Sequence, residues 1–238
     1  MTETVSSPIK TPPPRRLPVA VWSILAPLLG ALAGLLLGAI PIWLSGAHPL
    51  TAYGVMLTGA FGGARQITET ILRATPLLIM GLGLTVAFRG RVWNIGGEGQ
   101  YFIGALAGTV VGLLGQTTLP GALLIPLMLI AGLLGGALWA GVAALLRIRF
   151  GINEIIVTLM LNYIAEYSVL YVARQPLHDP ESFLPQSAQL LQAARLPTLV
   201  GTRLHVGILL ALLLIPLVYL LLWKTPLGFR IRAIGANP

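Results

Sequence analysis

Long stretches without a charged residue are the feature that most limits what this chain can fold into. They run from Val19 to Leu44, from Leu119 to Leu146 and from Leu204 to Trp223. A transmembrane helix needs roughly 20 mostly apolar residues to cross a hydrocarbon core about 30 Å thick. With only 9% charged residues, the chain also has too few polar side chains to cover a water-soluble globule. We therefore expect an all-α, polytopic transmembrane helical bundle.

Three further apolar runs bring the expected number of spans to about six. Ile155 to Ala173 is long enough to cross, although it contains Glu166. Pro76 to Phe88 and Tyr101 to Gly115 would extend only about 20 and 22 Å as helices, so neither crosses comfortably alone. The Gly-rich link between these two runs, residues 89–100, either dips back toward the membrane or forms a plain turn.

Two polar segments predict helices at the membrane surface. Arg65, Glu69 and Arg73 recur every four residues, which is typical of a separate interfacial helix. Thr75-Pro76 would then be the N-cap and first turn of the next span. In the external loop formed by residues 174–203, Gln186 to Arg195 are expected to form a short helix.

The distribution of lysine and arginine predicts the topology. Residues 1–18 form a polar tail, residues 19–223 the membrane domain and residues 224–238 a basic tail. With the N-terminus inside and six crossings, most basic residues lie on the cytoplasmic side, as the positive-inside rule requires. Those near the ends of spans are Arg89, Arg91, Arg147, Arg149, Lys224, Arg230 and Arg232.

Two series of glycines indicate close helix packing. One is Gly30, Gly34 and Gly38, and the other is Gly104, Gly108 and Gly112. Small residues at four-residue spacing let helix backbones approach closely in lipid. We assign these glycines to packing and not to a binding site.

A polar stripe winds along the predicted span 155–173 and its approach. It consists of Glu154, Thr158, Asn162 and Glu166, with Asn153 just before it. A carboxylate in hydrocarbon is unfavourable, so such residues usually face a bundle interior or a wet cavity. The alternative is that Asn153 and Glu154 lie at the cytoplasmic interface and Asn162 bonds to a neighbouring helix.

Asn94 and Glu98 lie where the two short apolar runs meet. Broken segments of this kind often build substrate sites, because the helix ends there expose backbone dipoles. The alternative is a plain cytoplasmic turn, and the spacing leaves both open.

Several classes of function lack their sequence signals. The chain has no cysteine and three scattered histidines, so we expect no metal site. It lacks a phosphate-binding loop ending in Lys-Ser/Thr, so we expect no ATP hydrolysis by this chain and no cofactor. Its basic residues form no stripe with interleaved aromatics, so the net charge of +8 does not indicate nucleic-acid binding.

Three blocks carry a resemblance to a known family. They are Ala74-Thr75-Pro76-Leu77-Leu78-Ile79-Met80-Gly81-Leu82 running into Asn94-Ile95-Gly96-Gly97-Glu98-Gly99-Gln100, Gly151-Ile152-Asn153-Glu154-Ile155-Ile156-Val157-Thr158-Leu159-Met160-Leu161-Asn162-Tyr163, and Thr225-Pro226-Leu227-Gly228-Phe229-Arg230-Ile231-Arg232-Ala233-Ile234-Gly235-Ala236-Asn237-Pro238. With them the chain resembles ABC importer permeases of the ribose and branched-chain amino acid superfamily, and most of all the subgroup that works with nucleoside-binding lipoproteins.

The resemblance implies a permease for nucleosides or related simple sugars in the bacterial plasma (inner) membrane. Its implied partners are a second permease subunit, a cytoplasmic ABC ATPase, an external solute-binding lipoprotein and the lipid bilayer. The first two blocks imply a solute pathway near Asn94, Glu98, Gln100, Asn153, Glu154, Thr158, Asn162 and Glu166. The third implies a cytoplasmic coupling loop that docks on the ATPase through Thr225, Gly228, Arg230, Arg232, Gly235 and Asn237.

The chain departs from the family pattern in two places. Gly97 stands where alanine is more common, and the sequence stops at Pro238, whereas family members continue through further helices. The chain is therefore expected to be a fragment or a truncated product. Two other functions remain open: an ion-coupled secondary transporter that uses Glu98, Glu154 or Glu166, and a non-transporting membrane assembly protein.

Overall fold

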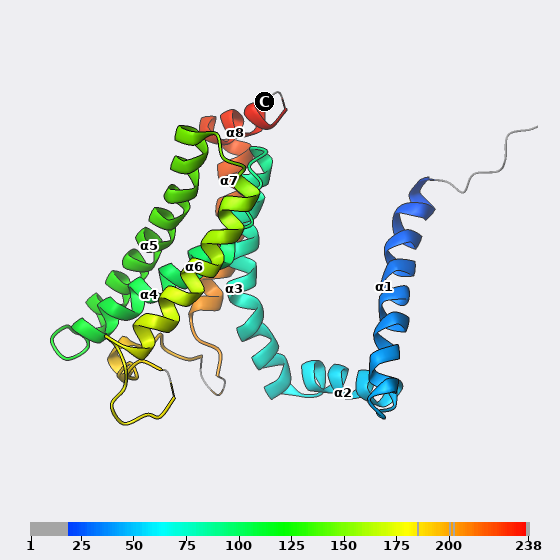
Figure 1. Ribbon diagram of the computed structural model, residues 1–238, viewed down its shortest axis with the longest axis horizontal. Coiled ribbons are helices and arrows are strands. Elements are labelled where there is room, and N and C mark those ends of the chain that lie inside the picture. The colour runs from blue at the N-terminus through cyan, green and yellow to red at the C-terminus, as the bar shows by residue number, and fades with distance from the viewer. Residues whose placement is uncertain (1–18, 185, 200, 202, 237–238) are drawn as a thin grey trace, which may run out of the picture. The chain divides into compact units, whose positions relative to one another are not determined.

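The structure of the protein is a computed structural model that describes residues 19–184, 186–199, 201 and 203–236 (Figure 1). Within these residues all regular secondary structure is helical, apart from two isolated β-bridges. The expected all-α fold is confirmed. By its internal contacts the chain divides into an N-terminal unit that ends at Gly62 and a second unit that begins at Gly63.

The described residues contain 5 helices that are long and apolar enough to cross a membrane. They lie in α1 (Val19–Leu44), α3 (Ala64–Arg89), α5 (Gly121–Phe150), α6 (Glu154–Arg174) and α7 (Gly207–Lys224). A sixth helix, α4 (Gly97–Gly115), has a shorter apolar part because its first turns carry Glu98 and Gln100. This count agrees with the predicted bundle of about six spans.

The N-terminal unit consists of α1 and the short α2 (Pro49–Phe61). The Tyr53 hydroxyl of α2 donates a hydrogen bond to the Leu35 carbonyl of α1 at 2.5 Å. It also lies 3.1 Å from the place where a Cβ on Gly38 would stand. Of the first glycine series, Gly38 is thus the position that allows close packing within this unit.

Helix α3 corrects the prediction of a separate surface helix ahead of Pro76. Residues 64–89 form one continuous helix with Pro76 inside it. The Thr75 hydroxyl is not an N-cap but donates to the Ile71 carbonyl at 2.8 Å. Prolines are tolerated inside membrane helices where neighbouring hydroxyls satisfy the backbone, so the proline marks no boundary here.

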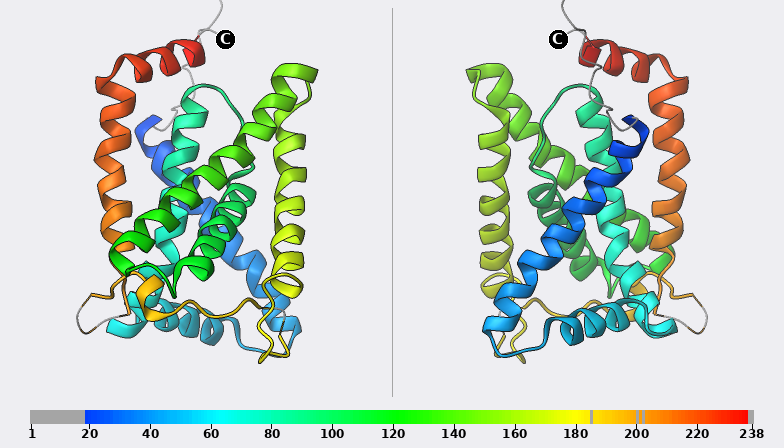
Figure 2. Two further views of the ribbon diagram at one scale, coloured as in Figure 1. Left: turned by 90° about the vertical axis from the view of Figure 1, so that its left-hand side faces the viewer. Right: turned by 90° about the vertical axis from the view of Figure 1, so that its right-hand side faces the viewer.

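In the second unit, α4 and α5 pack side by side, backbone against backbone (Figure 2). A methyl group on Gly104 would lie 2.7 Å from the Gly132 carbonyl oxygen, and one on Gly108 would lie 3.1 Å from that of Met128. At Gly112 it would meet the Met128 methyl at 2.7 Å. The predicted role of this glycine series in helix packing is confirmed.

The turn between α5 and α6 follows ordinary rules for helix ends. Gly151 adopts a left-handed conformation with φ 65°, which lacks a steric cost only for glycine, and closes α5. Asn153 is the N-cap of α6, and its side chain accepts a hydrogen bond from the Ile155 amide at 2.9 Å. This tight turn sets Arg147 of α5 beside Glu154 of α6.

The loop after α6 contains less helix than predicted. Within Gln186–Arg195 only the single turn η1 (Gln192–Ala194) is helical. The backbone before η1 bonds elsewhere, since the Leu191 amide donates to the Gln116 side chain at 2.8 Å. Arg203 pairs with Glu69 of α3 at 2.5 Å, which attaches the end of the loop to the bundle.

The basic tail after α7 is a helix and not the predicted loop. Helix α8 (Pro226–Ala236) lies across the end of the unit where α3 and α7 end (Figure 1). Thr225 is its N-cap, because its hydroxyl accepts from the Gly228 amide at 3.1 Å, and Pro226 suits the first helical position. Asn237 and the predicted tail 1–18 lie outside the described residues.

Candidate functional site

The link between α3 and α4 runs along the side of α6. The Trp93 amide donates to Glu154 Oε1 at 2.7 Å, and the Ile95 amide donates to Thr158 Oγ1 at 3.3 Å. One turn further, the Asn162 side chain donates to the Ile95 carbonyl at 3.0 Å. Glu154 and Asn162 are eight residues apart, which corresponds to a rise of about 12 Å along α6. Helix α4 therefore begins about 12 Å from the N-terminal end of α6. The link thus runs along roughly two turns of α6 before α4 begins.

Glycines allow this close approach. A Cβ on Gly96 would lie 3.0 Å from that of Thr158, and one on Gly99 would lie 2.9 Å from Asn162 Oδ1. The Gly99 amide itself donates to Asn162 Oδ1 at 2.8 Å. At Gly97 a Cβ would meet only Leu84, at 3.9 Å. The structure thus has room for alanine at Gly97, where the sequence departs from the family pattern, but not at Gly96 or Gly99.

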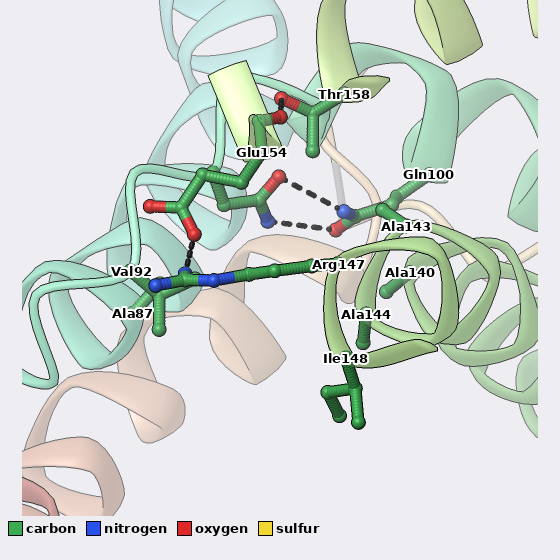
Figure 3. A pocket seen from close by; sticks show the side chains of 11 residues that line it. Ala87, Val92, Gln100, Ala140, Ala143, Ala144, Arg147, Ile148, Glu154 and Thr158 are labelled. Carbon is green, nitrogen blue, oxygen red and sulfur yellow. Dashed lines mark hydrogen bonds and ion pairs between the residues drawn. The ribbon is translucent and has the colours of Figure 1, made fainter. Parts of the chain in front are cut away.

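Glu154 connects three elements. One carboxylate oxygen accepts the link amide of Trp93, and the other pairs with Arg147 at the end of α5 (Figure 3). The Glu154 side chain is only 13% exposed, whereas that of Arg147 is 47% exposed. Sequence reasoning places Arg147 only at the end of a span. The signal for its pairing with Glu154 is its position just before a glycine turn and a carboxylate.

Asn94 and Gln100 form an amide pair at the start of α4. Asn94 Oδ1 accepts from the Gly96 amide at 2.9 Å and from Gln100 Nε2 at 3.2 Å. The pair fixes the turn that starts the helix, so both side chains have a structural role.

Two cavities lie on either side of the link. The first has a volume of about 410 Å³, and its walls include Val92, Asn94, Gln100, Arg147, Glu154 and Thr158 (Figure 3). The second has about 640 Å³, and its walls include Arg73, Phe88, Asn94, Glu98, Tyr101 and Phe102. Asn94 lines both, so the link is a wall shared by the two cavities.

The predicted polar stripe divides into two parts. Glu154, Thr158 and Asn162 all face the link and are held by it. Glu166 is exposed and makes no hydrogen bond or ion pair within the described part of the chain. Each step of four residues advances about 40° around a helix, and three such steps separate Glu154 from Glu166. Glu166 therefore lies on a different face of α6, about 120° away from Glu154. Asn153 lines neither cavity and serves as the N-cap.

The predicted coupling residues also differ among themselves. Arg230 is exposed on α8, whereas Arg232 is half-buried with its guanidinium 4.4 Å from the centre of the Trp223 ring. Gly228 and Gly235 are points of close backbone contact. A Cβ on Gly228 would lie 2.0 Å from the Leu221 carbonyl oxygen of α7, and one on Gly235 would lie 2.0 Å from the Arg89 carbonyl oxygen of α3. The contact of Trp223 with Arg232 is not predictable from the sequence, because a tryptophan at the end of a span is also typical of the membrane interface.

Residues 66–238 match the family described as the permease component of the branched-chain amino acid transport system. The chain belongs to this permease family. With its several membrane-spanning helices, this permease is a multi-pass membrane protein. No solved structure shows a significant match to it.

Curated relatives of this permease are named for sugars and nucleosides. It is 37% identical to a glucose ABC transporter permease protein of Haloferax volcanii, over 94% of this chain and 61% of that protein. It is 34% identical to a guanosine ABC transporter permease protein of Bacillus subtilis, over 90% and 62%. It is 30% identical to a nucleoside ABC transporter permease protein of Lactococcus lactis, over 90% and 61%. The chain thus spans about three fifths of the length of these relatives.

Proposed function

We propose that this permease is a membrane-spanning subunit of an ATP-driven importer for nucleosides or related simple sugars. The observation that carries the proposal is the family match over residues 66–238, together with the names of the relatives. Its partners would be a second permease subunit, an external solute-binding lipoprotein and a cytoplasmic ATPase, which would hydrolyse the ATP. It would lie in the bacterial plasma membrane with its N-terminus in the cytoplasm.

The cavity beside the start of α4 is the proposed solute contact. Helix ends inside a membrane protein expose backbone dipoles toward polar ligands. Here the exposed Glu98 supplies hydrogen-bond acceptors for hydroxyl groups, and Tyr101 and Phe102 supply flat apolar surfaces. Pockets for small molecules combine a mostly apolar wall with a few polar groups in this way. The mixture suits a sugar ring or a nucleobase with its ribose.

The outer face of α6 is proposed as a second part of the pathway. Glu166 stands near the middle of this helix and is exposed, as are Tyr163 and Tyr167 on the same face. A carboxylate in mid-membrane is unfavourable against lipid, so this face is expected to meet water or protein.

Cysteine labelling tests this face of α6 directly, because the chain contains no cysteine of its own. We expect Tyr163→Cys, Glu166→Cys and Tyr167→Cys to react with a membrane-impermeant thiol reagent, and guanosine or glucose to slow the reaction. The matched control is Leu138→Cys in the middle of α5, which is 73% exposed and whose neighbours on the same helix face, Leu134, Gly135, Gly141 and Val142, carry no polar side chain. If the three α6 positions react no faster than Leu138→Cys, this face is not a wet pathway.

The exposed face of α8 is proposed to dock on the ATPase. Leu227, Arg230 and Ile234 all point away from the second unit, and an apolar patch with one cation suits a protein partner. We expect Arg230→Glu to lower ATP-driven uptake roughly tenfold, because charges at an interface govern association.

Arg149→Glu is the matched control for this charge reversal, since it makes the same change on an exposed residue that belongs to α5 and not to α8. Uptake that falls equally in both variants would point to a general effect of charge. Uptake that survives Arg230→Glu would remove Arg230 from the docking surface.

Uptake into membrane vesicles distinguishes the importer from its rivals. We expect accumulation of guanosine or glucose to require ATP and to survive ionophores. Loss of uptake under ionophores with ATP present would instead indicate an ion-coupled carrier that uses Glu98, Glu154 or Glu166. No solute dependence under any condition would indicate an assembly protein.

A further inference from the structure

A tryptophan with two arginines joins the ends of three helices. The guanidinium carbon of Arg232 in α8 lies 4.4 Å from the centre of the Trp223 ring, and that of Arg89 in α3 lies 5.3 Å from it. Both distances fall within the range of cation–π attraction. Arg232 Nε is buried without a hydrogen-bond partner among the described residues. The indole is therefore the group that holds the Arg232 guanidinium in place.

Helix α8 also contacts the start of the link directly. A Cβ on Gly235 would lie 2.0 Å from the Arg89 carbonyl oxygen and 3.6 Å from Gly90 Cα. One on Gly90 would lie 3.6 Å from the Ile231 side chain. Since packed backbones leave no free space, α8 cannot move toward the link without displacing residues 89–90.

The other end of the link is fastened to α6 and, through Glu154, to α5. Trp93 and Ile95 bond to Glu154, Thr158 and Asn162 through their backbone atoms. Asn94 between them lines both cavities. Residues 89–96 thus have α8 at one end and the cavity wall at the other.

We propose that residues 89–96 transmit movement of α8 to the two cavities, and that Trp223 is the positioning residue that keeps α8 attached to this segment. The proposal rests on the proposed docking of α8 on an ATPase. When α8 is displaced, Arg89 and Gly90 move with it. The hydrogen bonds from Trp93 and Ile95 to α6 then shift, and the wall at Asn94 changes position.

Hydrogen exchange of the purified chain tests the mechanical contact without any partner. Trp223→Leu removes both cation–π contacts. We expect the amides of Trp93 and Ile95 then to exchange roughly tenfold faster, because the free energy of two weak cation–π contacts together corresponds to about this ratio of rates. Amides of α4 and α5 should keep their protection. Trp223→Phe retains an aromatic face and should restore most of the protection at the link.

The matched control is Trp43→Leu in α1, which makes the same change in the N-terminal unit. It should leave the link amides unchanged. The proposal is overturned if Trp223→Leu leaves exchange at Trp93 and Ile95 as in the parent, or if it accelerates exchange equally throughout the chain.

A second measurement addresses coupling in the full transporter assembled with its ATPase. We expect Trp223→Leu to lower the amount of solute moved per ATP hydrolysed by roughly tenfold while ATP hydrolysis continues. Parental stoichiometry in this variant would overturn the proposal and leave the importer function intact. Absence of ATP-driven uptake in the parent protein would instead overturn the importer function and the transmission role together.

Discussion

Gly104→Val is expected to destabilise the second unit by about 1–3 kcal/mol, the range for inserting side-chain atoms into a closely packed core. The new Cβ would stand 2.7 Å from the Gly132 carbonyl oxygen, a distance that real Cβ atoms do not show. Because the neighbour is backbone and not a flexible side chain, relief requires α4 and α5 to separate. Thermal unfolding in detergent, followed by near-ultraviolet circular dichroism of the aromatic side chains, would measure the loss.

Gly141→Val is the matched control for this prediction. Gly141 also lies on α5, and a Cβ there would meet no atom within 4 Å. The two variants share the intrinsic effect of replacing glycine with a β-branched residue in a helix. Their difference therefore reports the contact alone. If both variants unfold at the same temperature, the backbone packing of α4 against α5 contributes nothing measurable.

Arg147→Met is expected to destabilise the protein more than Glu154→Gln does, although the two side chains form one pair. Removing Arg147 leaves a carboxylate that is only 13% exposed without its cation. Removing the charge of Glu154 leaves a guanidinium that is 47% exposed and reaches water, and glutamine retains an oxygen for the Trp93 amide. We expect losses of about 2–3 and about 1 kcal/mol, since an unpaired buried charge is the larger penalty.

The double variant completes the test. If burial of an unpaired charge is the cause, Arg147→Met with Glu154→Gln should be more stable than Arg147→Met alone. Chemical or thermal unfolding of the three variants and the parent gives the coupling free energy. Additive losses would show that the two residues act independently, and the assigned role of Glu154 as the anchor of three elements would be wrong.

The sequence predicted the membrane spans well, because length and hydropathy alone determine which segments can cross a bilayer. Helix α1 ends at Leu44, where the first predicted span ends. The wrong predictions concern helix ends, where tertiary packing can override the local preference of a residue. Pro76 suggested a helix start, but α3 continues through it, and the Thr-Pro pair at residues 225–226 does start a helix that had been predicted as a loop. Local preference alone does not separate these two cases.

The candidate site was predicted in part. The spacing of the polar stripe on α6 brought Glu154, Thr158 and Asn162 to one face, and the structure places them together against the link. Their partners were not predictable, because they are backbone atoms of Trp93, Ile95 and Gly99, which no side-chain pattern reveals. The interpretation that Asn162 bonds to a neighbouring helix is confirmed, since Asn162 Oδ1 accepts from the Gly99 amide of α4, and its place in a solute pathway stays a prediction.

The way in which the link is fastened sets which substitutions it tolerates. Trp93 and Ile95 are exposed and bind α6 through main-chain groups that every residue type except proline provides in full. Mutational scanning should therefore find these two positions permissive to most side chains but intolerant of proline. Glu154, Thr158 and Asn162 supply the complementary side-chain atoms, so the sequence constraint that keeps this segment in place falls on α6.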